Sequence, residues 1–255
     1  MPLRPSGIVS LLTDFGHRDP YVGVMKGAVL RANPKAVLVD LGHEVPAQDV
    51  AAGAFWWAAA IGRFPVGTVH TGVVDPGVGT ARRILAALAC ECIWLAPDNG
   101  LLAAVLAQDP GAEVRAIDVE HLQLRDVSRT FHGRDVFAPV AGWLAGGRYG
   151  FASLGPRIDD AAAGEVPFAG PPQVVHIDGY GNAITNVSVA ALAGVTAIEV
   201  GGRQLSMRGT YGDVPPGEPL ALVGSYGLLE IAVNGGNAAD RLGLRRGTRI
   251  GLPAG

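Results

Sequence analysis

At residues 73–83 the chain reads Val73-Val74-Asp75-Pro76-Gly77-Val78-Gly79-Thr80-Ala81-Arg82-Arg83, closing an apolar run that starts at Thr68. An apolar run that stops at a carboxylate is typical of a buried strand ending at the ligand-binding edge of an open α/β sheet. Pro76 fixes φ and the glycines permit a tight turn, so we expect the Asp75 carboxylate to be held rigidly. An arginine nearby would stabilise its negative charge.

The flanking sequence predicts an α/β domain over residues 1–158, with a central, mostly parallel sheet covered by helices. Apolar runs alternate with helical segments, which favours this arrangement. Asp19 as N-cap with Pro20 after it, and Asp49 as a second cap, open two of the helices. The expected strands are 8–13, 36–41, 68–74, 84–96 (one long apolar run) and 114–119, and the expected helices are 20–32, 49–63, 101–108 and 134–145.

The composition changes in the last hundred or so residues. Residues 159–172 are rich in Ala, Gly and Pro and are expected to be a linker. Short alternating segments separated by Gly and Pro turns then predict an all-β, barrel-like domain over 173–255.

Composition excludes several classes of protein. With 49% hydrophobic and 17% charged residues, the 255-residue chain can bury a sizeable core. A net charge of -3 gives no electrostatic reason to expect nucleic acid or an anionic membrane as partner. Neither a signal-peptide core nor an apolar run of about 18 residues is present. We expect a cytoplasmic protein in which Cys90 and Cys92 are reduced.

Polar turns follow four of the strand-like runs. If the sheet is mainly parallel, these turns line one edge and form a site, with Asp14 as the residue that grips ribose hydroxyls. The alternative is that Asp and Asn simply favour turns and helix caps. The four turns are Thr13-Asp14-Phe15-Gly16, Gly42-His43-Glu44, Asp75-Pro76-Gly77 and Asp98-Asn99-Gly100.

Three further clusters carry groups suited to chemistry or binding. In 130–135, His132 precedes a helix and could act as a base, or it could be a solvated loop residue beside capping side chains. In 178–186, Tyr180 could stack on a planar ring and Asn182 could read its edge, or the segment is an ordinary Gly-rich hairpin. The turn 224–227, which carries Ser225, is a weaker signal.

Several well-known motifs are missing. The sequence has no Gly-Lys-Ser/Thr phosphate loop, no Gly-x-Gly-x-x-Gly after the first strand and no zinc-binding spacing. A metal held by His43, His70, His132 and Asp75 is a minor alternative, and we predict no metal site.

Taken in order, these clusters resemble the S-adenosylmethionine (SAM) hydroxide adenosyltransferase family, which is related to the SAM-dependent fluorinase and chlorinase. The match covers nearly the whole chain. The resemblance implies an N-terminal α/β domain, a C-terminal β-barrel and a homotrimer that binds its ligand between domains of neighbouring subunits. The motifs are 12–16 with Asp19 and Tyr21, 74–79, 97–100, 131–135 and 178–182.

The resemblance also implies an activity, the hydrolysis of SAM to adenosine and L-methionine by water attack at the ribose C5′, with SAM as substrate and no cofactor. It assigns the ribose hydroxyls to Asp14, and water activation to Asp75, Arg82 and His132, with Arg83 as the substitute if the register slips by one. Stabilisation of Asp75 by Arg82 mildly favours His132 as the base, but the residues leave the choice open. The other implied contacts are Asp19, Asp178 and Ser225 with the methionine, Tyr21 beside them, and Tyr180, Asn182 and backbone near Asn234 and Gly235 with the adenine.

Two alternatives remain. The halogenating relatives carry tyrosine, threonine and serine where this chain has Asp75, Val78 and Gly133, and an anionic Asp75 would repel a halide. The chain could also bind SAM or adenosine without turnover, although pure binding needs no water-activating trio.

Overall fold

A computed structural model of the chain describes residues 3–162, 164 and 166–253. The chain divides into two compact units, Met1–Val166 and Pro167–Gly255. The boundary between them lies inside the Ala-, Gly- and Pro-rich segment 159–172.

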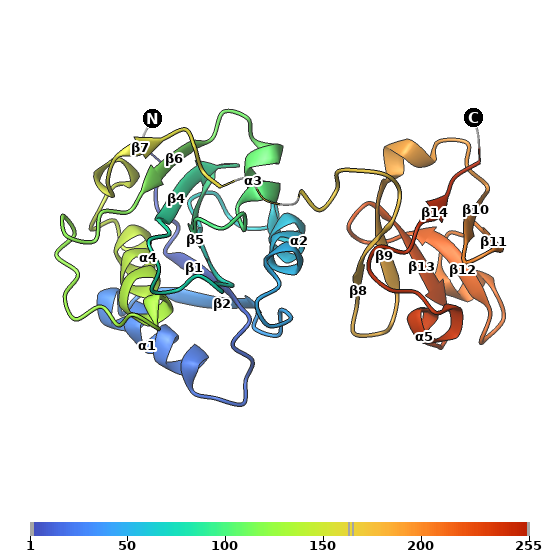
Figure 1. The fold of residues 1–255 in the computed structure, drawn as a ribbon, viewed down its shortest axis with the longest axis horizontal. Helices are drawn as coiled ribbons and strands as arrows, with labels where there is room; N and C mark the ends of the chain where they lie inside the picture. The colour runs from blue at the N-terminus through green and yellow to red at the C-terminus, as the bar shows by residue number, and fades with distance from the viewer. Residues whose placement is uncertain (1–2, 163, 165, 254–255) are drawn as a thin grey trace. The chain divides into compact units, whose positions relative to one another are not determined.

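The N-terminal unit is built on a seven-stranded sheet in the order β2-β1-β3-β5-β4-β6-β7 (Figure 1). Parallel pairs join β2, β1, β3 and β5, and antiparallel pairs add the remaining strands, so that β4 and β7 run opposite to the other five. The predicted mostly parallel sheet is therefore confirmed. The strands are β1 (Ile8–Thr13), β2 (Val37–Gly42), β3 (Val69–Val73), β4 (Ile84–Ala89), β5 (Cys92–Pro97), β6 (Glu113–Ala116) and β7 (Arg157–Ile158).

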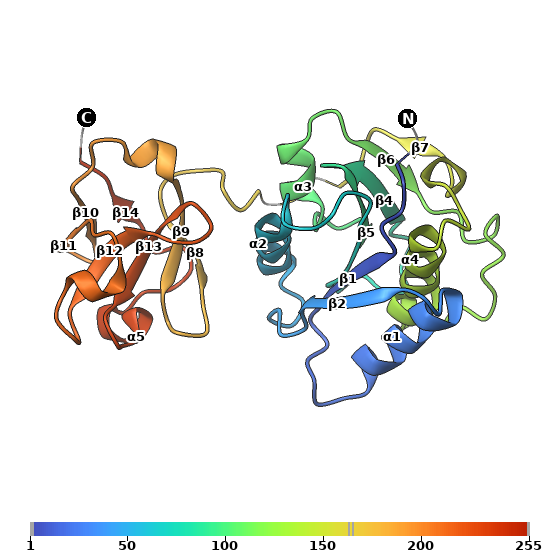
Figure 2. The ribbon, with the colours of Figure 1, turned by 180° about the vertical axis from the view of Figure 1, so that it is seen from behind.

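Helices cover both faces of this sheet, as the two opposite views show (Figures 1 and 2). On one face lie α1 (Tyr21–Ala32) and α4 (Ala138–Ala145), and on the other α2 (Val50–Ala60) and α3 (Ala103–Gln108). A π-helical turn, Gly133–Phe137, precedes α4. Because each face of the sheet packs on helices, every residue of β3 and β5 is buried, which explains their continuous apolar runs.

Two local predictions are wrong. The run 84–96 is a hairpin rather than one strand, because Cys90 and Glu91 adopt positive φ (49° and 58°) and reverse the chain between β4 and β5. Asp19 does not cap α1: Pro20 is the N-cap residue and no side chain bonds the first turn. Asp49 does cap α2, accepting a hydrogen bond from the Ala52 amide at 2.9 Å.

The C-terminal unit consists of two antiparallel sheets, β12-β13-β9-β8 and β11-β10-β14, with a short helix α5 (Ala238–Leu242). Bridges between Met207 and Ala221 and between Gln173 and Arg249 connect the sheets at both edges, which gives the predicted barrel-like arrangement. The strands are β8 (Val174–Ile177), β9 (Ala183–Ser188), β10 (Ala197–Val200), β11 (Arg203–Ser206), β12 (Pro219–Val223), β13 (Leu228–Val233) and β14 (Ile250–Gly251).

Across the part of the chain that the structure describes, no helix has the length and apolar character needed to cross a membrane.

Candidate active site

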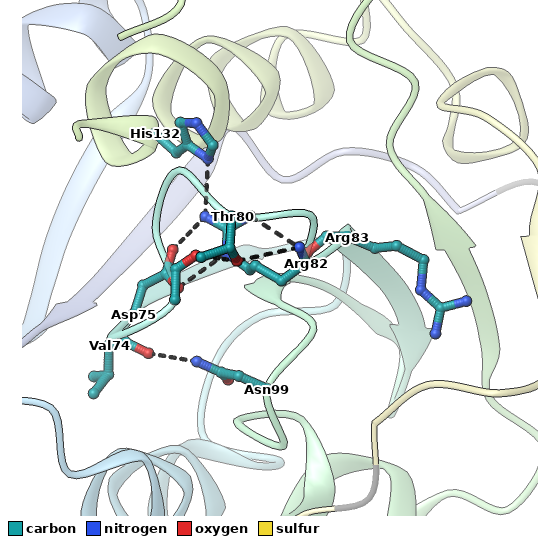
Figure 3. Close-up of polar contacts among 8 residues, drawn as sticks. Val74, Asp75, Thr80, Arg82, Arg83, Asn99 and His132 are labelled. Atoms are coloured by element: carbon teal, nitrogen blue, oxygen red, sulfur yellow. Dashed lines mark hydrogen bonds and ion pairs between the residues drawn. The ribbon is translucent and has the colours of Figure 1, made fainter. Parts of the chain in front are cut away.

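Arg82 joins two carboxylate oxygens and an imidazole in one cluster (Figure 3). Its Nε donates to Asp75 Oδ1 at 2.9 Å, and its Nη2 donates both to Asp75 Oδ2 and to His132 Nδ1, the latter at 2.9 Å. The Arg82 and Asp75 side chains are only 8% and 3% exposed. The three residues predicted to activate water therefore lie together, although His132 comes from a distant part of the sequence.

The turn between β3 and β4 holds Asp75 in place. The Asn99 side-chain amide donates to the Val74 carbonyl at 2.8 Å, and Thr80 Oγ1 donates to the Gly77 carbonyl at 2.7 Å. Gly79 has φ of 78°, and a Cβ there would come within 2.2 Å of a backbone carbonyl oxygen. Only glycine fits this position, because its backbone passes against the Arg129 carbonyl, so the turn is packed closely against that distant segment.

Arg83 extends away from the cluster (Figure 3). Its Nε donates to Asp98 Oδ2 at 2.6 Å and its Nη1 to Asp160 Oδ1 at 2.6 Å. Asp98 was expected at the edge of the site, but its carboxylate instead holds Arg83 and the backbone amide of Ala162. Of the two neighbouring arginines, Arg82 is the one that contacts Asp75.

The protonation of His132 follows from its partner. A guanidinium has no acceptor, so His132 Nδ1 must accept the bond from Arg82, and in the neutral ring the proton is then on Nε2. Burial, helped by the positive charge of Arg82, lowers the pKa of His132 below its usual 6.5. His132 is therefore neutral at pH 7 and presents an N–H donor.

A pocket of about 220 Å³ lies in front of Asp75 and His132. Asp14 lines this pocket, and its Oδ2 accepts a hydrogen bond from the Gln48 amide at 2.7 Å. Gln48, whose backbone amide makes this bond, has a positive φ of 64°. The lining residues are Asp14, Phe15, Gln48, Val73, Asp75, Pro76, Val78, Thr130, Phe131, His132 and Gly133.

Two aromatic rings that the sequence motifs contain, but to which no role was assigned, form a wall of this pocket. Phe15 and Phe131 pack edge to face with 5.8 Å between ring centroids. Tyr21 packs against both rings, at 6.0 and 5.4 Å, so it lies beside the pocket. Asp19 is exposed in the loop before α1.

Two of the histidines considered as alternative metal ligands are each hydrogen-bonded to a different hydroxyl group. His70 is buried, bonds Ser10 Oγ at 2.6 Å and stacks on Trp94. His43 bonds Thr13 Oγ1 at 2.8 Å. Among the described residues no three His, Cys, Asp or Glu side chains are grouped as metal ligands.

The C-terminal unit has a pocket of its own, of about 600 Å³. It includes the predicted residues Tyr180, which is 81% exposed, and Asn182. Asp178 shapes the loop that carries them, because its Oδ1 accepts from both of their backbone amides at 2.9 Å. The pocket is lined by Tyr180, Asn182, Tyr211, Val233, Gly235, Gly236 and Asn237.

The structure separates two neighbours that were predicted together. Gly235 lines the C-terminal pocket, whereas Asn234 donates its side-chain amide to the Val214 carbonyl at 2.7 Å and its backbone amide to the Glu218 carbonyl at 3.1 Å. Ser225 lies on the turn between β12 and β13. Tyr211 was missed, since a lone tyrosine in a polar loop carries no pattern that marks it.

Comparisons with known proteins identify the family. Residues 9–155 match the SAM hydroxide adenosyltransferase N-terminal domain, and residues 172–251 match the C-terminal domain. An (R)-S-adenosyl-L-methionine hydrolase from Thermus thermophilus is 42% identical, over 98% of this chain and 100% of the relative. A fluorinase from an Actinoplanes species is more distant, at 26% identity over 73% of this chain and 70% of the relative.

Solved structures agree with this assignment. The crystal structure of an uncharacterized conserved protein from Thermotoga maritima superposes with a TM-score of 0.89 and 34% identity, covering 96% of this chain and 99% of that one. Both units and their order are thus those of one family. The chain belongs to the SAM hydroxide adenosyltransferase family.

Proposed function

We infer that this chain is an enzyme that hydrolyses SAM to adenosine and L-methionine. Its relatives at 36–42% identity bear the name (R)-S-adenosyl-L-methionine hydrolase. The observation that carries the inference is the Asp75–Arg82–His132 cluster beside a pocket that also contains Asp14. A protein that only binds SAM has no need of a buried carboxylate and imidazole organised by one guanidinium.

The reaction suits a pocket without a metal. The leaving group of SAM is a sulfonium, which departs as a neutral thioether, so neither an acid nor a Lewis acid is required to expel it. We therefore propose that no cofactor takes part. As the oxygen of water bonds to C5′, the C5′–S bond breaks with its electron pair going to sulfur, and the positive charge leaves with the proton that water gives up to a base. A pocket walled by Phe15 and Phe131 favours that step by limiting solvation of the cation.

The hydrogen bonds favour Asp75 over His132 as the group that takes the proton from water. His132 Nδ1 already accepts from Arg82, and Nε2 of the neutral ring carries a proton, so the ring has no free acceptor. Each Asp75 oxygen accepts from Arg82 but keeps a further lone pair. We propose that Asp75 accepts the proton as the C5′–O bond forms, while His132 Nε2–H orients the water. This reverses the preference drawn from sequence.

A pair of substitutions at His132 tests this division of roles. Glutamine retains an N–H donor, so His132→Gln should keep more activity than His132→Ala, whereas Asp75→Asn should lose nearly all of it. If His132→Gln is as inactive as His132→Ala while Asp75→Asn retains turnover, the assignment of the base to Asp75 is wrong.

The remaining contacts with SAM are proposed on the family resemblance. Asp14 would hold the ribose hydroxyls, and the wide C-terminal pocket would hold the adenine against Tyr180 and Asn182, with Gly235 and backbone near Asn234 beside it. The methionine portion is assigned to Asp19, Tyr21, Asp178 and Ser225.

Assembly is part of the same proposal. We propose a cytoplasmic homotrimer in which the N-terminal unit of one subunit and the C-terminal unit of another bind one SAM molecule; the free thiols of Cys90 and Cys92 agree with a reducing compartment. Mixing inactive Asp75→Asn subunits with subunits made inactive at Asn182 should restore activity if a site is shared. No recovery after subunit exchange, with both variants trimeric, would exclude shared sites.

Product analysis tests the function itself. The protein is incubated with SAM in heavy-oxygen water, with and without chloride or fluoride, and the products are identified by mass spectrometry. We expect adenosine that carries the heavy oxygen at O5′, unlabelled methionine and no change with halide. A 5′-halo-adenosine would show that the protein is a halogenase. SAM binding without any product would show that it only binds SAM.

A further inference from the structure

Glu230 is a buried acid that the proposed reaction does not use. It lies on β13 and is 5% exposed. Its Oε1 accepts a hydrogen bond from the Tyr211 hydroxyl at 2.7 Å. Burial raises the pKa of Glu230, and the bond to Glu230 raises the pKa of Tyr211 to about 12, so the phenol is the donor of this pair at neutral pH. A buried acid at this depth is costly unless it has a specific partner.

Tyr211 is the other member of the pair, and it lines the pocket of about 600 Å³ with Tyr180 and Asn182. Its backbone is held by a short helical turn, Tyr211–Asp213, closed by a reciprocal cap between Thr210 and Asp213. Tyr211 is 42% exposed, so the pocket leaves part of this residue open to solvent. The hydrogen bond from its hydroxyl to Glu230 ties this part-exposed residue to the buried strand β13.

The second carboxylate oxygen of Glu230 meets the turn that carries Ser225. A Cβ added at Gly224 would lie 2.3 Å from Glu230 Oε2, so this turn passes directly against the carboxylate, and a larger residue there would have to displace it. One buried side chain therefore contacts both a wall of the pocket and the loop beside it.

We propose that Glu230 is a positioning residue that fixes the Tyr211 ring as a wall of the C-terminal pocket, against which the planar base of the nucleoside packs. The inference rests on the proposed function in taking adenine as the occupant. Fixing the ring before binding removes the entropy cost of ordering it with the ligand, so the effect is expected on affinity rather than on the chemical step.

Four variants of the full-length protein test this role. Tyr211→Phe and Glu230→Ala break the bond, Glu230→Gln keeps an acceptor oxygen for the Tyr211 hydroxyl, and Glu199→Ala removes an exposed acid from β10 of the same unit as a control. Tyr211→Phe deletes one hydroxyl from a part-exposed residue but leaves the buried Glu230 without its donor, so thermal unfolding of each variant checks that the fold is kept. The measurements are KM and kcat for SAM and, independently of turnover, the Kd of adenosine by calorimetry.

We expect Tyr211→Phe and Glu230→Ala to raise KM and the adenosine Kd about three- to tenfold, with kcat within about twofold of wild type. Glu230→Gln and Glu199→Ala should stay near wild type, and the double variant Tyr211→Phe/Glu230→Ala should be no weaker than Glu230→Ala. An unchanged Kd in Tyr211→Phe, or additive losses in the double variant, would overturn the inference. If the wild-type protein does not hydrolyse SAM, the proposed function fails, and the adenosine Kd values still decide the role of Glu230.

Discussion

Replacing Arg82 by lysine keeps the positive charge but removes the geometry that organises the candidate active site. The guanidinium makes two hydrogen bonds to Asp75 and one to His132, and a single ammonium cannot span all three acceptor atoms. Asp75 is 3% exposed, so water cannot replace the lost donors freely. Breaking a buried pair outright costs about 3–5 kcal/mol, and the retained charge reduces this to about 2–3 kcal/mol. If this free energy is lost from the stabilisation of the transition state, kcat falls about one hundredfold.

Arg83→Lys is the matched control. Arg83 is adjacent in sequence and also paired, but its side chain is 34% exposed and one partner, Asp160, is 79% exposed. The Arg83–Asp160 pair contributes about 0–1 kcal/mol. Asp98 is only 7% exposed, but neither it nor Arg83 lines the pocket, so turnover should stay within about fivefold of wild type. The assay is the initial rate of adenosine formation at saturating SAM, with thermal unfolding of each variant. Near-normal kcat in Arg82→Lys, or equal losses in both variants, would refute the reasoning.

Three further outcomes are expected. Asp14→Ala, made in an Asp75→Asn background to prevent turnover, should weaken SAM binding by calorimetry at least about tenfold; unchanged affinity would remove Asp14 from the site. Burial lowers the pKa of His70 from 6.5 to about 3. Below pH 6.5 the unfolded state therefore binds a proton that the folded state does not, and the free energy of unfolding falls as the pH drops from 6.5 toward 3. Urea unfolding should show a loss approaching about 1.4 kcal/mol per pH unit between these values, and His70→Asn should flatten it. Gly142→Ala places a Cβ 2.7 Å from the Ala32 Cβ and the Val29 carbonyl oxygen of α1, and should lower the free energy of unfolding by about 1–3 kcal/mol. Gly150→Ala, which meets nothing within 4 Å, should lower it much less.

The fold class was predictable because burial leaves a periodic trace in the sequence. Strands covered on both faces read as continuous apolar runs, and the short alternating segments after residue 172 read as a small antiparallel barrel. The same trace failed at 84–96, where two strands and their turn are apolar throughout except for Glu91. A hydrophobic pattern predicts which residues are buried, but it does not predict where the chain reverses direction.

The sequence by itself determined which residues stand at the strand ends, and the ordered motifs were enough to indicate the family. It could not decide between Arg82 and Arg83, the tautomer of His132, or the pairing of Tyr211 with Glu230. Each of these depends on which atoms meet across segments far apart in the chain, as His132 and Arg82 do. A hydrogen bond depends on distance and direction within a few tenths of an ångström, and only tertiary packing sets those. For that reason the residues were enough to indicate the type of chemistry, whereas the proposal that Asp75 is the base came from the hydrogen bonds.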